Sequence, residues 1–414
     1  MQSYTKGLAG IFWFTAPNVA CFFVFAPIAF RIRKLMPNGY TLPEFIYSRF
    51  GKQTHLAFLI IFLGYQIGAI VINSLAGGIL LSTLCGIDLK LCIILVSLTA
   101  LSYAIISGLR ASVVTDFIQM TMILVIVLMI VPLCLSNSNG IRLGGVNENY
   151  QNIFNPWIAF SMGIPMTLSL IAGPIADQMF FQRALSLQEK YVKKSFMCAG
   201  LIFAIVPIIL SLLGFIGADL SNRGLINVED SQMVAPVVIA YLLPKSALYA
   251  FTLMAFAGLC STMDSAFCAL SSLGSIDIYK RYINPKANDR KVLFFSRWFM
   301  IFMAFLGTSL ALLNPDLLWV FLIYGALASA GMFPCIFALY WSRATAKGTL
   351  WAVALSVLVS LPISIYGNIT ENQYIIVFSS VLSVLIGLIV CIISSLVNKD
   401  RKYNFKTLRY ENQL

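Results

Sequence analysis

The chain has 414 residues, of which 59% are hydrophobic and only 11% are charged, and it carries a net charge of +12. Soluble domains are about 25% charged, so this composition and the mean hydropathy of +0.88 exclude an ordinary soluble protein and predict a membrane protein. The positive charge is spread over many loops rather than gathered in one patch, which argues against a nucleic-acid partner.

Apolar segments long enough to cross a membrane recur along the whole chain. A helix of about 20 residues spans a hydrocarbon layer of roughly 30 Å. We expect eleven such helices, over residues 8–30, 55–84, 89–107, 113–135, 156–176, 195–217, 246–275, 293–313, 317–341, 348–367 and 374–397. The loops 136–156 and 218–245 are long enough to cap the bundle. The sequence therefore predicts an all-α polytopic membrane protein with about 11 transmembrane helices.

The basic residues fall into alternate gaps between these helices. All but five of the 28 lysines and arginines lie on one side, the exceptions being Lys6, Lys90, Arg142, Arg223 and Lys245. Basic loops face the cytoplasm and its anionic leaflet. We therefore expect a cytoplasmic C-terminus and an external N-terminus, in a plasma membrane and most readily the inner membrane of a bacterium.

The expected helix 113–135 carries an acidic residue close to its cytoplasmic start. Asp116 lies in the segment SGLRASVVTDFIQ, six residues after Arg110. One interpretation is an ion pair with a basic loop residue such as Arg110, and another is a station on the path of an ion moving inward. The two interpretations are compatible.

The expected helix 156–176 contains the residues that interrupt helices. Pro165 lies inside it, and Gly173 and Pro174 come just before Asp177. Proline removes a backbone donor and bends or ends a helix. Interrupted helices near the middle of a membrane are where transporters bind solute, so the sequence predicts a polar path near Asp177.

The expected helix 246–275 carries adjacent hydroxyls in AGLCSTMDSAF. Gly258 lies three and four residues before Ser261 and Thr262, on the same face. Oxygen ligands of this kind suit a small hard cation such as sodium, although such hydroxyls also bond back to the backbone or hold helices together. Asp264 lies on another face, and a buried carboxylate needs donors, so we expect it in a structural network.

Five segments in this order resemble the sodium:solute symporter family, whose members carry sugars, proline, carboxylates, vitamins, urea or choline. They are GYTLPEFIYSRFG at 39–51, SGLRASVVTDFIQ at 107–119, DQMFFQRAL at 177–185, AGLCSTMDSAFCALSSLGSIDIYKR at 257–281 and FPCIFALYWSRATAKG at 333–348. The resemblance implies a single domain over 1–414, with the inverted-repeat core of the leucine transporter.

In that core, residues 8–135 would be core helices 2–5, residues 156–341 core helices 6–10, residues 348–397 two peripheral helices and residues 398–414 a cytoplasmic tail. The segment QSYTKGLAGIFWFTAPN resembles the approach to core helix 2. The resemblance and the external N-terminus together predict that core helix 1, which supplies further sodium and solute contacts in the family, is missing from this sequence.

The resemblance also implies roles for single residues. It assigns the sodium site to Gly258, Ser261 and Thr262, and the sodium release path to Asp116. Sugar-carrying members place an asparagine where this chain has Asp177, and a glutamate near the position of Phe14. An aspartate can pair with an amine, so we favour an amino-acid-like or nitrogenous solute over a sugar. The expected solute-binding residues are Asp177, Gln178, Phe14, Trp13 and Gln66.

The leading hypothesis is sodium-coupled symport of a small organic solute. The alternative is a solute sensor that does not transport, or an inactive remnant of a transporter. An enzyme is not expected, because the one histidine, His55, and nine scattered cysteines offer no zinc cluster or catalytic triad. The expected partners are the solute, sodium as coupling ion and the lipid bilayer, with no cofactor and no obligatory protein partner.

Overall fold

The computed structural model describes residues 1–138, 152–397 and 402–405. These residues form helices joined by turns, without a strand, and eleven of the helices are long and apolar enough to cross a membrane. The predicted fold class and number of spans are therefore confirmed. Most of the predicted tail 398–414 and of the loop 136–156 lies outside the described residues. The expected absence of a core helix ahead of this sequence stays a prediction.

The first half of the chain forms five helices. Most are longer than the apolar runs that predicted them, because their ends continue into polar residues. They are α1 (Gln2–Leu35), α2 (Leu42–Phe50), α3 (Lys52–Cys85), α4 (Leu89–Ser107) and α5 (Leu109–Asn137). A bend at Lys6 and Gly7 interrupts α1 near its start, and the φ angle of 50° at Gly7 is one that glycine adopts readily.

The second half begins with an interrupted helix. It comprises α6 (Pro156–Ile158), the π-helical segment η3 (Ala159–Gly163) and α7 (Ile164–Ile175), and it is followed by the short α8 (Gln178–Ser186). The chain is extended at Asp177, with φ −112° and ψ 116°. The break that Gly173 and Pro174 predicted is confirmed, and it falls directly after them.

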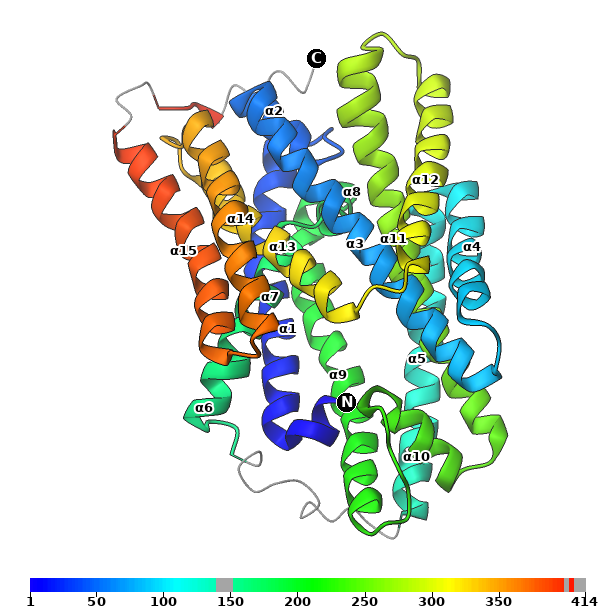
Figure 1. Ribbon diagram of the computed structural model, residues 1–414. Helices are drawn as coiled ribbons and strands as arrows, with labels where there is room; N and C mark the ends of the chain where they lie inside the picture. Colours follow the sequence, from blue (N-terminus) through cyan, green and yellow to red (C-terminus); the bar gives the residue numbers. More distant parts are fainter. Residues whose placement is uncertain (139–151, 398–401, 406–414) are drawn as a thin grey trace.

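The remaining elements complete the bundle. They are α9 (Glu189–Asn222), the 3-10 turn η4 (Ser231–Met233), α10 (Val234–Leu242), α11 (Lys245–Ser272) continuing as the π-helical η5 (Leu273–Ile283), α12 (Asp289–Leu312), α13 (Leu317–Tyr340), α14 (Ala346–Ile369) and α15 (Gln373–Val397). Figure 1 shows α2 and the loop between η5 and α12 at one end of the bundle and α6 and α10 at the other. We call the first of these the basic end, because Arg49, Lys280 and Arg281 lie there.

Small residues and aromatic rings hold the helices together. The helix α1 runs along α9, and α3 packs against α4, α11 and α13. A Cβ added at Gly200 of α9 would lie 2.8 Å from the Cβ of Phe22 in α1, so glycine permits that close approach, as is common between helices in membranes. Phe25 and Phe181 are fully buried in the largest core cluster. Seven of the nine cysteines are buried and all are free, as expected for packing residues.

The C-terminal end of α13 is held by two arginines from other helices. Arg49 of α2 donates hydrogen bonds to the carbonyl oxygens of Phe337 and Ala338, and Arg31 of α1 donates to that of Leu339 at 3.2 Å. The last carbonyls of a helix have no partner within it and carry the negative end of its dipole. The two guanidinium groups therefore fix α13 at the basic end.

Candidate functional site

The break between α7 and α8 places a carboxyl group inside the bundle. Asp177 is 2% exposed and begins α8 by accepting a hydrogen bond from the backbone N–H of Met179 at 2.8 Å. The same carboxyl oxygen, Oδ1, accepts a second bond from Nε2 of Gln66 on α3 at 2.7 Å. Both bonds fall on Oδ1, which leaves Oδ2 for a further donor.

Gln66 supplies a second hydrogen-bond acceptor beside Asp177. It is fully buried, and a carboxylate accepts hydrogen bonds, so the amide NH₂ of Gln66 faces Asp177. Its amide oxygen Oε1 is consequently turned away, and it is buried without a hydrogen-bond partner. A buried polar atom without a partner costs about 1–3 kcal/mol. A ligand that donates a hydrogen bond would remove that cost.

Two tyrosine rings form a wall close to the break. Tyr65 of α3 and Tyr324 of α13 are stacked, with ring centroids 3.7 Å apart and an angle of 20° between planes. The hydroxyl of Tyr65 also lies against the last turn of α7, where a Cβ added at Gly173 would be 3.2 Å from it. Aromatic faces attract cations, so this wall suits a positively polarised group held by Asp177.

The other residues expected to bind solute have different contacts. Gln178 accepts from the backbone N–H of Leu42 at 3.3 Å and donates to the carbonyl of Tyr40 at 3.0 Å, so it fastens the start of α2. Trp13 donates to the carbonyl of Ile153 at 3.2 Å, and its ring fills the space over Gly163 of η3.

Phe14 lies half-buried on α1, where its backbone carbonyl accepts a hydrogen bond from Asn18 at 2.8 Å. Of the five expected residues, Gln66 and Asp177 are joined by a hydrogen bond. The solute roles of Gln178, Trp13 and Phe14 stay predictions.

The hydroxyls of the expected sodium site meet the acidic residue of α5. Ser261 donates a hydrogen bond to Oδ1 of Asp116. Thr262 donates to the carbonyl of Gly258 at 3.3 Å, which is the backbone bonding that the sequence left open as an alternative. A Cβ at Gly258 would meet Ile123 of α5 at 3.7 Å, an ordinary contact, so this glycine leaves space rather than closing an approach. One contact therefore joins a hydroxyl and a carboxylate, and a second joins a hydroxyl and a backbone carbonyl, which are the oxygen types that a small hard cation prefers.

An arginine shares this group of oxygens. Nη2 of Arg183, from α8, lies 2.7 Å from Oδ2 of Asp116 and 2.7 Å from the hydroxyl of Ser265. The ion pair expected for Asp116 is therefore present, with Arg183 as the basic partner instead of Arg110. The side chains of Arg183 and Asp116 are 31% and 24% exposed, so both remain accessible to water and ions.

Asp264 forms the structural network that was expected of it. It is fully buried and accepts hydrogen bonds from the hydroxyls of Ser112 at 3.1 Å, Ser265 at 3.1 Å and Thr115 at 3.2 Å. These donors come from α5 and α11. Because Ser265 also contacts Arg183, the network of Asp264 and the ion pair of Asp116 are joined through one hydroxyl.

Comparison with known proteins identifies the family of the chain. The sequence profile of the sodium:solute symporter family matches residues 2–355. The chain belongs to this family.

Curated relatives of this family member carry several kinds of solute. The urea-proton symporter DUR3 of Oryza sativa subsp. japonica is 24% identical over 410 residues, which cover 90% of this chain and 56% of that protein. The high affinity choline transporter 1 of Homo sapiens is 26% identical over 365 residues, which cover 83% and 62%. The sodium/glucose cotransporter of Vibrio parahaemolyticus is 23% identical, with 79% and 66% covered. The chain spans about half the length of the urea transporters that it matches.

Solved structures support the fold of the chain. A Na⁺-coupled sialic acid symporter superposes with a TM-score of 0.70 at 17% identity, covering 97% of this chain and 93% of that one. A nucleobase-cation-symport-1 family transporter reaches a TM-score of 0.54 at 13% identity, covering 99% and 91%. These likenesses establish a fold shared with known transporters. The family members named above are transporters rather than enzymes.

The chain also contains a buried cluster that the sequence did not indicate. His55 of α3 is fully buried, with one ring nitrogen 3.0 Å from Oδ1 of Asp277 in η5 and the other 2.8 Å from the hydroxyl of Tyr282. Thr41, at the start of α2, donates to Oδ2 of Asp277 at 2.7 Å. The sequence shows that His55 lies near the start of a helix. It does not show that His55 contacts Asp277, because the two residues are 222 positions apart. The cluster joins α2, α3 and η5 at the basic end.

Proposed function

We propose that the protein is a sodium-coupled symporter of a small nitrogenous solute, which binds beside Asp177 and Gln66. It would act in a plasma membrane with the basic end toward the cytoplasm, as the distribution of lysine and arginine favours. The solute, sodium and the lipid bilayer are its proposed partners, and sodium is its coupling ion. Family membership supports solute symport, and the chemistry of the break supports the choice of solute.

The pair of acceptors at the break carries this proposal. Oε1 of Gln66 is buried without a partner, and Oδ2 of Asp177 takes neither of the two hydrogen bonds that fall on Oδ1, so both oxygens can accept from a ligand. An ammonium, amide or urea nitrogen supplies several N–H donors on one small group, and a cationic group would also be attracted by the Tyr65 and Tyr324 rings. A sugar offers hydroxyls without charge. A nitrogenous solute therefore satisfies this site better, and the names of the urea and choline transporters among the relatives agree with it.

Coupling to sodium would work through the oxygens on α11 and α5. Gly258, Ser261, Thr262 and Asp116 supply them, and the guanidinium of Arg183 balances the carboxylate when no ion is near. A cation entering between Ser261 and Oδ1 of Asp116 would compete with the guanidinium of Arg183, at Oδ2, for the charge of the same carboxylate. Because Arg183 belongs to α8, which begins at Asp177, ion binding would act on the same helix that borders the solute.

Uptake by proteoliposomes tests the proposal. Radiolabelled urea, choline and glucose are supplied under an inward sodium gradient, an inward proton gradient or no gradient. We expect sodium-driven uptake of urea or choline and none of glucose. Asp177→Asn should raise the KM of the nitrogenous solute by about tenfold, since a hydrogen bond to a charged group contributes about 1.5–3 kcal/mol.

Asp219→Asn is the matched control, because that carboxylate in α9 pairs with Arg223, the residue directly after the helix. Uptake that ignores the sodium gradient, or a preference for glucose, would refute the proposal. Binding of urea or choline without uptake would instead support the solute-sensor alternative.

A further inference from the structure

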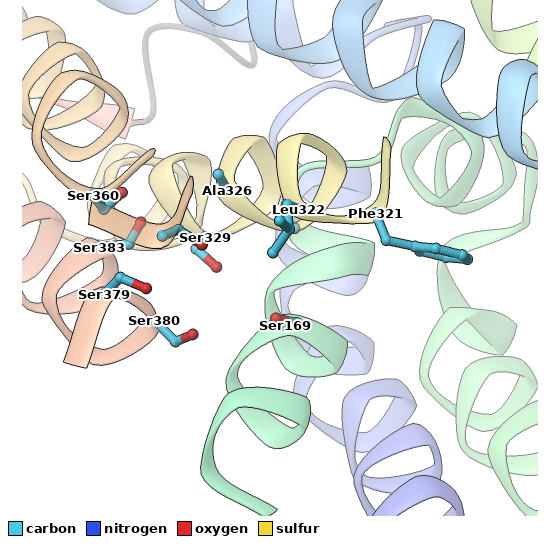
Figure 2. A pocket seen from close by; sticks show the side chains of 11 residues that line it. Ser169, Phe321, Leu322, Ala326, Ser329, Ser360, Ser379, Ser380 and Ser383 are labelled. Atoms are coloured by element: carbon cyan, nitrogen blue, oxygen red, sulfur yellow. The ribbon is translucent and has the colours of Figure 1, made fainter. Parts of the chain in front are cut away.

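A polar hollow lies between α7, α13, α14 and α15, and none of the residues that line it belongs to the proposed solute or sodium site. It is enclosed by α7, α13, α14 and α15, has a volume of about 70 Å³ and is lined by seven serines. Figure 2 shows the hydroxyls of Ser379, Ser380 and Ser169 turned toward the space between α15 and α7. Phe321 and Leu322 of α13 supply an apolar wall.

Three of these seven hydroxyls offer acceptors to the hollow. Ser379 and Ser380 give their protons to the carbonyl of Ile376 at 2.9 and 3.0 Å, and Ser360 gives its proton to the carbonyl of Ser356. Their oxygen lone pairs remain free to accept. A molecule held here would have to donate several hydrogen bonds.

Ser383 differs from these three serines, because its hydroxyl has no hydrogen-bond partner, and this difference indicates a ligand. Its residue is 2% exposed, it lines the hollow, and its hydroxyl is buried without a hydrogen-bond partner. The backbone carbonyl of Ser383 accepts a hydrogen bond from the hydroxyl of Ser356 at 2.9 Å, so the hydroxyl of Ser383 is the group that still lacks a partner. A buried hydroxyl without a partner is costly, and a ligand with both a donor and an acceptor would satisfy it.

Size and charge restrict the ligand further. A volume of 70 Å³ holds roughly five water molecules, or one molecule of about four to six non-hydrogen atoms. The lining contains no acidic, basic or histidine side chain. An ion would enter without a counter-charge and lose its hydration, so a neutral molecule is favoured.

We propose that this serine-lined hollow binds a small neutral amide, a molecule with N–H donors and one carbonyl acceptor. The N–H groups would donate to the oxygens of Ser379 and Ser380, and the carbonyl would accept from Ser383. The site is separate from Asp177 and does not depend on the proposed transport.

Acetamide, which has four non-hydrogen atoms, is a suitable probe. Saturation-transfer difference NMR on the protein in lipid nanodiscs measures its binding. Ser383→Ala breaks no bond of that hydroxyl within the protein and should weaken binding by about fivefold, the effect of one hydrogen bond. Gly325→Val should abolish binding, because a Cβ at Gly325 already lies 3.6 Å from the hydroxyl of Ser169 and the larger side chain would fill the hollow.

Ser395→Ala is the control, since Ser395 lies on the same helix but bonds to the carbonyl of Cys391. The same titration on Asp177→Asn removes any contribution from acetamide bound to the carboxyl at the break. Saturation transfer to acetamide bound in the serine-lined hollow should persist in that variant. No saturation transfer, or equal transfer in Ser383→Ala, Gly325→Val and the control, would mean that water alone fills the hollow and would overturn the proposal. A ²³Na relaxation effect that depends on Ser383, without acetamide binding, would overturn it in favour of a cation.

Discussion

Replacing Arg183 by glutamine tests how strongly the ion pair joins α8 to α5 and α11. The variant keeps a polar side chain but removes the charge beside Asp116 and shortens the reach to Ser265. Asp116→Asn removes the opposite charge, and the double variant completes a thermodynamic cycle that isolates the interaction of the two groups.

The magnitude follows from the geometry. At the N–O distance of 2.7 Å and an effective dielectric constant of about 20, the Coulomb attraction is roughly 6 kcal/mol. Loss of hydration offsets most of it. The side chains are 31% and 24% exposed, so the pair lies between a surface pair, with about 0.2–1 kcal/mol, and a buried one. We expect a coupling of about 2 kcal/mol, typical of a hydrogen bond to a charged group.

Unfolding in mixed micelles at increasing mole fractions of sodium dodecyl sulfate supplies the four free energies of the cycle. A coupling below about 0.5 kcal/mol would show that solvent screens the pair, and the argument from distance would fail. Sodium supplies a second readout. If the guanidinium competes with the ion for Asp116, then added sodium should stabilise Arg183→Gln more than the original protein; weaker stabilisation would contradict the competition.

Four further variants address the basic end. Arg49→Met removes donors from the last carbonyls of α13, and we expect a loss of about 1–2 kcal/mol; an unchanged thermal midpoint would show that those carbonyls are satisfied otherwise. His55→Leu leaves the fully buried Asp277 with fewer donors, so we expect the free energy of unfolding to fall by about 2–4 kcal/mol. Tyr282→Phe should lower it by about 1 kcal/mol. Equal losses for the two variants would contradict the central place of His55. Burial raises the pKa of Glu44 above its ordinary value of 4.5, so its ionisation opposes folding. Its contribution is constant below about pH 4.5 and reduces stability as the pH rises through the folded-state pKa. Glu44→Gln should flatten that part of the stability curve, and a variant curve parallel to the original would refute the assignment.

The sequence predicted the features that depend on neighbouring residues. Hydropathy over about 20 residues gave the eleven spans, and Gly173 with Pro174 gave the break, because both effects act through local backbone chemistry. The need of a buried carboxylate for donors likewise predicted the network of Asp264.

Pairings between distant segments could not be read in this way. Arg183 and Asp116 are 67 residues apart, and Gln66 and Asp177 are 111 apart. Which of several nearby cations reaches a carboxylate depends on how the helices are packed and rotated, so Arg110 was as reasonable a partner as Arg183. The unpartnered oxygen of Gln66 depends further on the orientation of one amide, which only its neighbours determine.

The attachment of α13 has a mechanical consequence. The helix is clamped at one end by Arg31 and Arg49 and contains Pro334 between that clamp and Tyr324. Proline weakens a helix locally, so Pro334 is a natural hinge. Ten residues separate it from Tyr324, a lever arm of roughly 15 Å at 1.5 Å per residue. A bend of about 10° there would displace Tyr324 by roughly 2.6 Å at right angles to the helix axis, which is comparable with the 3.7 Å between the ring centroids of Tyr324 and Tyr65. A small change in the bend of α13 is therefore enough to separate the Tyr65 and Tyr324 rings or to bring them together.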